Sequence, residues 1–111
     1  MKYLLILALL AGSVLLSAHP AKEVTLSFNQ ETSILTVNFS HSVKNAEKHF
    51  IEEITIYLND EQIILQTITK QDNLESGVFV YKIVEAKKGD NIKVVTKCNK
   101  FGKKSAEIVI E

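Results

Sequence analysis

The chain has no arginine and no tryptophan, and it has only one cysteine, one proline and four glycines among 111 residues. The absence of arginine makes the clustered basic side chains of a nucleic-acid-binding surface unexpected, so no nucleic-acid partner is predicted. So few glycines and prolines, with 46% hydrophobic residues, exclude a low-complexity or disordered chain. Thirteen lysines balance thirteen acidic residues, so net charge directs the protein to no class of partner. The length allows one domain and excludes a multi-domain enzyme.

The first 18 residues differ in character from the rest. Lys2 precedes an apolar run from Tyr3 to Leu16, and the small residues Ser17 and Ala18 follow the run. A basic start, an apolar middle and small residues at the end are the layout of a secretory signal peptide. The run is shorter than the ~20 apolar residues that span a membrane, and Gly12 and Ser13 interrupt it. We therefore expect cleavage after Ala18 and export to the periplasm or the outside, with residues 19–111 as the mature domain.

The mature chain alternates apolar and polar residues with a period of two. Such alternation, with many β-branched residues, predicts half-buried strands. The apolar positions that mark the seven expected strands are Val24/Leu26/Phe28, Leu35/Val37/Phe39, Ile54/Ile56/Leu58, Ile63/Leu65, Phe79/Tyr81/Ile83, Ile92/Val94/Thr96 and Ala106/Ile108/Ile110.

Turn-forming residues separate these segments. Asn59-Asp60 lies between two apolar runs and predicts a two-residue hairpin. The polar stretch Val43–Lys48 is the one place where a helical turn is expected. Seven short antiparallel strands in a domain of this size predict an all-β, immunoglobulin-like sandwich.

The three histidines and the cysteine of the chain all lie at expected strand ends or in loops. His19 starts the mature chain, His41 ends the second strand, His49 begins the third and Cys98 ends the sixth. Strand ends at one pole of a sandwich converge, and His41 and His49 flank one connection, so these two are expected to be neighbours. Imidazoles and a thiolate suit iron, zinc or copper. Taken singly, a histidine of this kind is more often a solvated loop residue than a ligand, and a lone cysteine is more often a small buried hydrophobe.

The sequence around these residues resembles that of a known protein family. His41-Ser42-Val43 and the later segment Lys48–Ile54 are similar to the H-P-M-x-x-x-H-Y-I-x-W-I segment of superoxide reductases, the desulfoferrodoxin and neelaredoxin family. Cys98–Gly102 (C-N-K-F-G) resembles their C-N-x-H-G loop, and His19-Pro20 stands where the family has its first ligand histidine. The resemblance covers residues 19–111 in order.

The resemblance implies a seven-stranded immunoglobulin-like sandwich and a mononuclear non-haem iron site that reduces superoxide to peroxide. Its ligands here would be His19, His41 and His49 in a plane and Cys98 as the axial thiolate. The pattern departs from the family at Phe101, which stands where the fourth histidine is expected. The His41–His49 loop is also two residues longer than the motif. The electron donor and the oligomeric state are not indicated by the sequence.

Two alternatives stay open at this stage. The sandwich is equally consistent with a metal-free binding module, which Phe101 and the altered Ser42-Val43 favour. If cleavage leaves His19 as the new N-terminus, its α-amino nitrogen is a second donor beside its own ring, and such a terminus is a good copper site. A frayed, solvated terminus is the simpler interpretation of His19.

Overall fold

A computed structural model describes residues 19–111, so the expected signal peptide lies outside the described residues. The described chain is all-β, with seven strands and no helix. The strands are β1 (Glu23–Asn29), β2 (Ile34–Ser40), β3 (Ile51–Leu58), β4 (Glu61–Thr67), β5 (Ser76–Lys82), β6 (Asn91–Cys98) and β7 (Lys103–Val109). Each expected strand is found, because the period-two alternation in each segment places its apolar side chains on one face.

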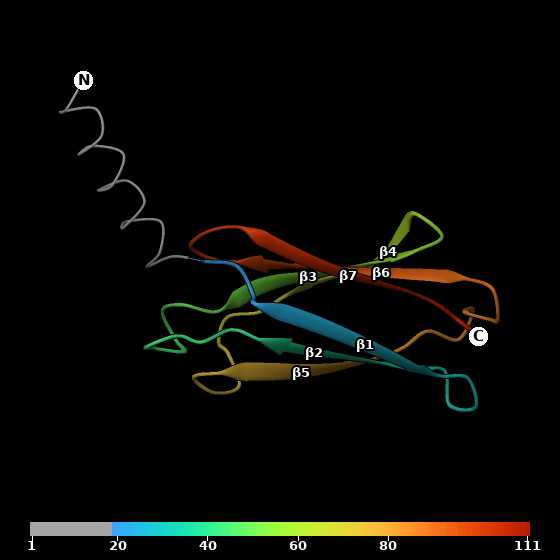
Figure 1. Cartoon of the computed structure of the whole chain (residues 1–111), viewed down its shortest axis with the longest axis horizontal. Coiled ribbons are helices and arrows are strands. Elements are labelled where there is room, and N and C mark those ends of the chain that lie inside the picture. The colour runs from blue at the N-terminus through green and yellow to red at the C-terminus, as the bar shows by residue number, and fades with distance from the viewer. Residues whose placement is uncertain (1–18) are drawn as a thin grey trace, which may run out of the picture.

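The strands form two antiparallel sheets that pack as a sandwich (Figure 1). One sheet has the order β1-β2-β5 and the other has the order β4-β3-β6-β7. The predicted immunoglobulin-like sandwich is confirmed. Strand β2 ends at the same pole as β6, the pole where β3 begins and where the described chain starts (Figure 1).

The inward faces of the two sheets form the core. Leu35 and Val37 from β2 are fully buried, as are Ile54 and Ile56 from β3 and Ile92 from β6. These are the positions that the alternation predicts to face inward. Strand β4 departs from the simple pattern, because Ile56 pairs with Ile64 while Tyr57 pairs with Gln62. The extra residue, Ile63, is a bulge that changes the face of the following residues, and Leu65 is 54% exposed.

The connections follow the local chemistry of the sequence. Asn59 and Asp60 have φ angles of +49° and +69°, as a two-residue type I′ hairpin requires, so the predicted turn is confirmed. The chain makes the expected single turn within and just after Val43–Lys48. The amides of Lys48 and His49 both donate to the carbonyl of Asn45, at 3.2 and 2.9 Å.

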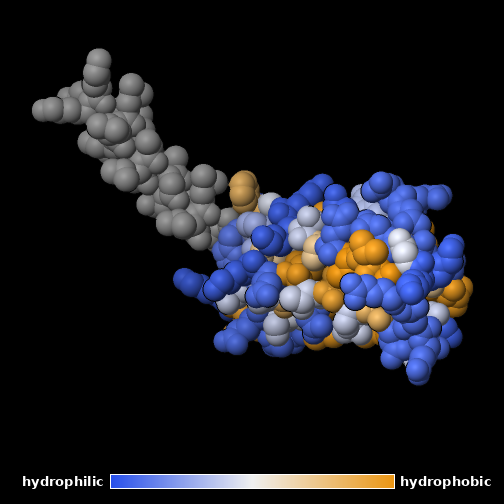
Figure 2. Space-filling view, turned by 45° about the vertical axis from the view of Figure 1, so that its right-hand side comes forward, coloured by the Kyte–Doolittle hydropathy of each residue, from blue (hydrophilic) through white to orange (hydrophobic). Residues whose placement is uncertain are grey.

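Figure 2 shows hydrophobic side chains gathered over the middle of one face and bordered by hydrophilic ones. No helix within residues 19–111 is long and apolar enough to cross a membrane.

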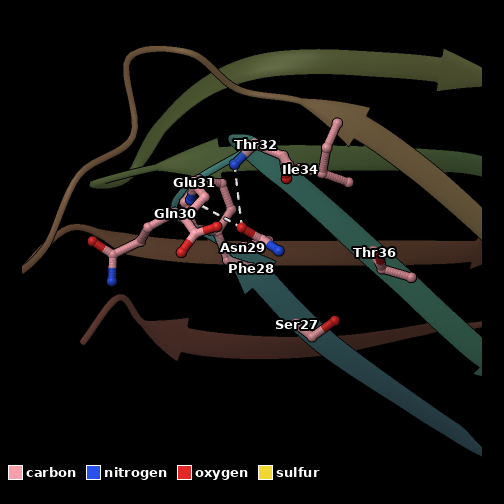
Figure 3. A pocket seen from close by; sticks show the side chains of 8 residues that line it. All are labelled: Ser27, Phe28, Asn29, Gln30, Glu31, Thr32, Ile34 and Thr36. Carbon is pink, nitrogen blue, oxygen red and sulfur yellow. Dashed lines mark hydrogen bonds between the residues drawn. The ribbon is translucent and has the colours of Figure 1, made fainter.

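A hollow opens beside the β1–β2 turn, at the pole opposite to His41 (Figure 3). There, Oδ1 of Asn29 accepts hydrogen bonds from the amides of Glu31 and Thr32, at 2.9 and 3.2 Å. These bonds tie the side chain of Asn29 into its own turn. The residues that line the hollow include none of the histidines and no cysteine.

Candidate metal centre

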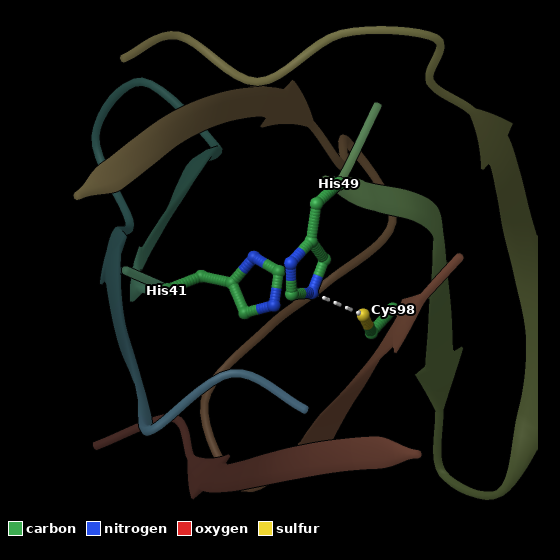
Figure 4. Close-up of side chains that lie close together, drawn as sticks. All are labelled: His41, His49 and Cys98. Carbon is green, nitrogen blue, oxygen red and sulfur yellow. Dashed lines mark hydrogen bonds between the residues drawn. The ribbon is translucent and has the colours of Figure 1, made fainter. Parts of the chain in front are cut away.

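Three separate segments bring His41, His49 and Cys98 together at the pole where β2 and β6 end. One donor atom from each of these residues lies within 4.8 Å of the others. Figure 4 shows the three side chains pointing towards one another from the end of β2, the start of β3 and the end of β6. His41 is fully buried, Cys98 is 3% exposed and His49 is 9% exposed. The group can hold a metal ion, as the sequence predicts for these residues.

Cys98 has two polar neighbours. Nε2 of His49 lies 3.2 Å from its Sγ, and the amide of Lys100 donates to the same sulfur at 3.4 Å. The sulfur therefore lies beside a ring nitrogen of His49, as two ligands of one ion would.

Asn99 fixes the His49 segment against the cysteine loop. Its Oδ1 accepts from the amide of Phe50 at 3.0 Å, and its Nδ2 donates to the carbonyl of Lys48 at 3.0 Å. The main-chain amide of Asn99 also donates to the carbonyl of Phe50, at 3.0 Å. These three bonds hold both neighbours of His49. A bulge at Glu52 follows, since Ile51 pairs with Cys98 and Glu53 with Lys97.

Gln71 orients the ring of His41. The side-chain amide nitrogen of Gln71 donates to the carbonyls of His41 and Asn73, at 2.8 and 2.9 Å, which fixes the orientation of the amide. Its Oε1 then faces Nδ1 of His41 at 2.7 Å and accepts a hydrogen bond from it. Holding Nδ1–H in this way leaves Nε2 as the ligand atom, as outer partners do for metal-bound histidines.

The other ring nitrogen of His41 contacts the segment before β1. Nε2 lies 3.1 Å from the carbonyl oxygen of His19. With Nδ1–H bonded to Gln71, Nε2 either carries a second proton, which it donates to this carbonyl, or has a lone pair that a metal ion can take.

His19 completes a cluster of three imidazoles. Its ring centroid lies 5.1 Å from that of His41 and 5.4 Å from that of His49, and the latter two are 4.8 Å apart. The segment is held in place by the neighbouring loop, because Pro20 packs on Gly102, where an added Cβ would lie 3.0 Å from Cδ of Pro20. Nδ1 of His19 lies 3.0 Å from the carbonyl oxygen of Pro20. His19 therefore borders the group of donors, and its role as a ligand remains a prediction.

The surroundings keep His49 neutral. Burial is the largest cause that lowers the pKa of His49, followed by the positive charge of His41, His19 and Lys100. A hydrogen bond to the backbone of His19 acts in the opposite direction. A neutral imidazole is the form that binds a metal, so the cluster favours the ligand form of His49.

Phe101 lies in the turn after Cys98 and is 50% exposed. The chain thus has no imidazole at the position where the resemblance expects a fourth, and the described residues gather three imidazoles and one sulfur at this pole. The histidines and the cysteine at this pole were all predicted as site residues, but the positioning roles of Asn99 and Gln71 were not. Two features of the sequence point to those roles: an asparagine directly follows the cysteine, and a glutamine begins the turn Gln71–Asn73.

A scan against models of known protein families finds no match, and a search of curated proteins finds no significant match. The functional argument therefore depends on the site itself.

Proposed function

We propose that this protein binds one transition-metal ion through His41, His49 and Cys98, with the imidazole of His19 as a fourth ligand. The observation that carries the proposal is the meeting of His41, His49 and Cys98 at one buried pole, with one donor atom from each within 4.8 Å of the others. The donor set supports the same conclusion, since imidazoles and thiolate are ligands that zinc, copper and iron prefer.

The contacts around the donors support a bound ion rather than a chance cluster. Gln71 fixes the tautomer of His41, and the amide of Lys100 donates to the sulfur of Cys98. Asn99 holds both residues that flank His49. Gln71 and Lys100 thus contact donor residues directly and Asn99 holds the chain on both sides of His49, as outer partners do around a protein metal site.

We further propose that the metal is iron and that the protein is an exported superoxide-reductase-like protein. The support is the resemblance of both ligand segments to superoxide reductases, in the same order along the chain. Iron would supply the electron that reduces superoxide to peroxide. Lys100, which lies close enough to lower the pKa of His49, raises the positive potential near the site and favours an approaching anion. Phe101 leaves one imidazole fewer than the family pattern, so a slower reaction than in the family is expected.

The test is metal analysis of the mature domain, purified from cells grown with iron, copper and zinc available. The proposal expects one iron per chain and a thiolate-to-iron absorption band in the visible after oxidation. The variant Cys98→Ser should lose the band, and the matched control Ser105→Ala, on the exposed face of β7, should keep it. Superoxide consumption that follows the iron content would support the activity. A chain with no stoichiometric metal would exclude every form of the proposal.

Copper is the second candidate, and the composition of the compact group favours it. His41, His49 and Cys98 are two imidazoles and one thiolate, a ligand set that suits copper in electron-transfer proteins. In that case the protein carries copper or electrons and does not reduce superoxide. One copper per chain, an intense thiolate-to-copper band and no superoxide consumption would select this candidate over iron.

A further inference from the structure

We propose that removal of the leader completes the metal site, because cleavage after Ala18 creates an α-amino group on His19 among the ligands. The inference rests on the metal-binding function proposed above, with copper, the second candidate, as the ion, and adds its regulation. The chain would acquire its full affinity, with a preference for copper, only after processing.

The main chain of His19 already lies inside the cluster. Its carbonyl oxygen is 3.1 Å from Nε2 of His41, and its ring centroid lies 5.4 Å from that of His49. The nitrogen and carbonyl oxygen of one residue are at most roughly 3.6 Å apart, given standard bond lengths. The α-nitrogen of His19 therefore lies within about 6.7 Å of Nε2 of His41, the sum of the two distances.

The residues that follow hold this segment in place. Pro20 packs on the Gly102 turn, Ala21 is 3% exposed, and the amide of Lys22 donates to the carbonyl of Ser40 at 2.8 Å. Because the chain is anchored within three residues of His19, the ion does not have to order this segment when it binds. Little binding free energy is therefore lost as conformational entropy of the segment.

Cleavage changes the chemistry of one atom. In the uncleaved chain the nitrogen of His19 belongs to a peptide bond, and resonance with the carbonyl removes its lone pair from coordination. A leader peptidase hydrolyses this bond with one water. The oxygen of the water goes to the new carboxylate of Ala18, and the nitrogen of His19 gains hydrogen and becomes an amine. The amine has a free lone pair whenever it is unprotonated.

The new donor favours copper. The amine and the ring of one histidine can bind the same ion, and nitrogen ligands bind Cu(II) more tightly than the other common divalent ions. Binding through Nδ1 would replace its present contact with the carbonyl of Pro20, at 3.0 Å. Because this residue is half-buried at the edge of the cluster, the exchange needs no change in the strands.

The experiment compares two forms of the described domain. One begins with the free amine of His19, and the other keeps His19 in peptide linkage behind a flexible Gly/Ser extension, which places the free amine far from the site. Copper affinity is measured by competition with a chelator of known strength. In the same samples, an acylating reagent is applied with and without copper, and labelling of the His19 amine and of the lysines is read by mass spectrometry.

The inference expects copper to bind about tenfold or more tightly to the free-amine form, because the second donor is attached to the first. Copper should also protect the His19 amine from acylation while the lysines stay reactive. Equal affinities with an unprotected amine would overturn the inference and leave the His41, His49 and Cys98 site intact. Failure of both forms to bind any metal would exclude the proposed function as well.

Discussion

At the scale of single residues, Gln71 and Asn99 determine where the donor atoms point, although neither offers a ligand of its own. Gln71 is 2% exposed and uses its whole side-chain amide within the site. Asn99 does the same for the two neighbours of His49. Substitutions at such positions should alter metal affinity without removing a ligand. They therefore test how much the orientation of the donor atoms contributes to binding.

The substitution Gln71→Leu tests this role for His41. It leaves Nδ1–H of His41 buried without an acceptor, so we expect metal affinity to fall by about 10–100-fold. The free energy of unfolding should fall by about 1–3 kcal/mol, because the buried donor has lost its partner. Competition titrations and urea unfolding give the two quantities. The exposed Gln62→Leu is the matched control and should change neither; unaltered affinity in the Gln71 variant would remove Gln71 from the site.

The hydroxyl of Tyr81 makes no hydrogen bond in the described fold. This hydroxyl is buried, and burial raises the pKa of the phenol. We expect Tyr81→Phe to raise the free energy of unfolding by about 1 kcal/mol, because it removes an unsatisfied group and keeps the ring. Urea unfolding measures the change, with the half-buried Tyr57→Phe on β3 as the control. A loss of stability would indicate that the hydroxyl has a partner in solution.

At the scale of elements, the pairing of β2 with β5 depends on a glycine opposite an aromatic ring. Gly77 pairs with Phe39, and a Cβ at this position would lie 2.2 Å from Cζ of that ring. The ring of Phe39 also stacks on Phe79, with centroids 6.1 Å apart, so it has little room to move away. The absence of a side chain at position 77 therefore belongs to the packing of this sheet.

We expect Gly77→Ala to lower the free energy of unfolding by about 1–3 kcal/mol through this overlap. Chemical denaturation measures the loss. The double variant Gly77→Ala with Phe39→Leu should lose less than the sum of the two single changes, because the smaller side chain makes room for the new methyl group. Additive effects would show that the cost arises from the backbone and not from contact with the ring.

The Asn59-Asp60 hairpin is linked to the loop before β6 by the carboxylate of Asp90. Asn59 donates its side-chain amide to Oδ1 of Asp90 at 3.0 Å, and the amide of Lys87 donates to Oδ2 at 3.0 Å. The bond from Asn59 is the main cause that holds the pKa of Asp90 below its ordinary value, and the bond from Lys87 adds to it. A lowered pKa means that the folded protein binds the proton less readily than the unfolded chain does.

Stability from Asp90 is therefore present above the ordinary aspartate pKa of about 4 and is lost as the pH falls through the lower pKa of the folded state. We expect the difference in unfolding free energy between the wild type and Asp90→Asn to be largest near neutral pH and to shrink in acid. Urea unfolding at a series of pH values tests this, with the exposed Asp60→Asn as the control. A difference that is constant with pH would mean that the carboxylate charge has no part in the link.

At the scale of the whole molecule, an ion that binds only the folded state should stabilise it. At a free concentration about 100 times the Kd, the gain is about 2.7 kcal/mol. For a domain of this size that raises the Tm by roughly 10–20 °C. Thermal unfolding with added metal measures the shift, and Cys98→Ser should reduce it. A shift that persists in a variant lacking Cys98 and both loop histidines would place the ion elsewhere.

The sequence allowed the fold to be predicted almost completely, because each strand has its own period-two pattern and each turn its own local chemistry. The meeting of His41, His49 and Cys98 was also predictable, since all three lie at strand ends of one pole. The contributions of Gln71 and Asn99 were not. Their partners in the site are 30 and about 50 residues away along the chain. The pattern of apolar and polar residues does not predict hydrogen bonds between residues so far apart in the sequence. The bulge at Ile63 was missed for a similar reason, because it depends on the register with β3.

The pole that gathers the donors also joins the two layers of the sandwich. His41 follows β2 of the β1-β2-β5 sheet, whereas His49 precedes β3 and Cys98 ends β6, both in the β4-β3-β6-β7 sheet. An ion shared by them is a cross-link between the layers, in a chain whose single cysteine cannot form an internal disulfide. Loading or removing that ion would then change how readily the sheets separate at this end, and amide hydrogen exchange in the last residues of β2 and β6 would follow the metal content.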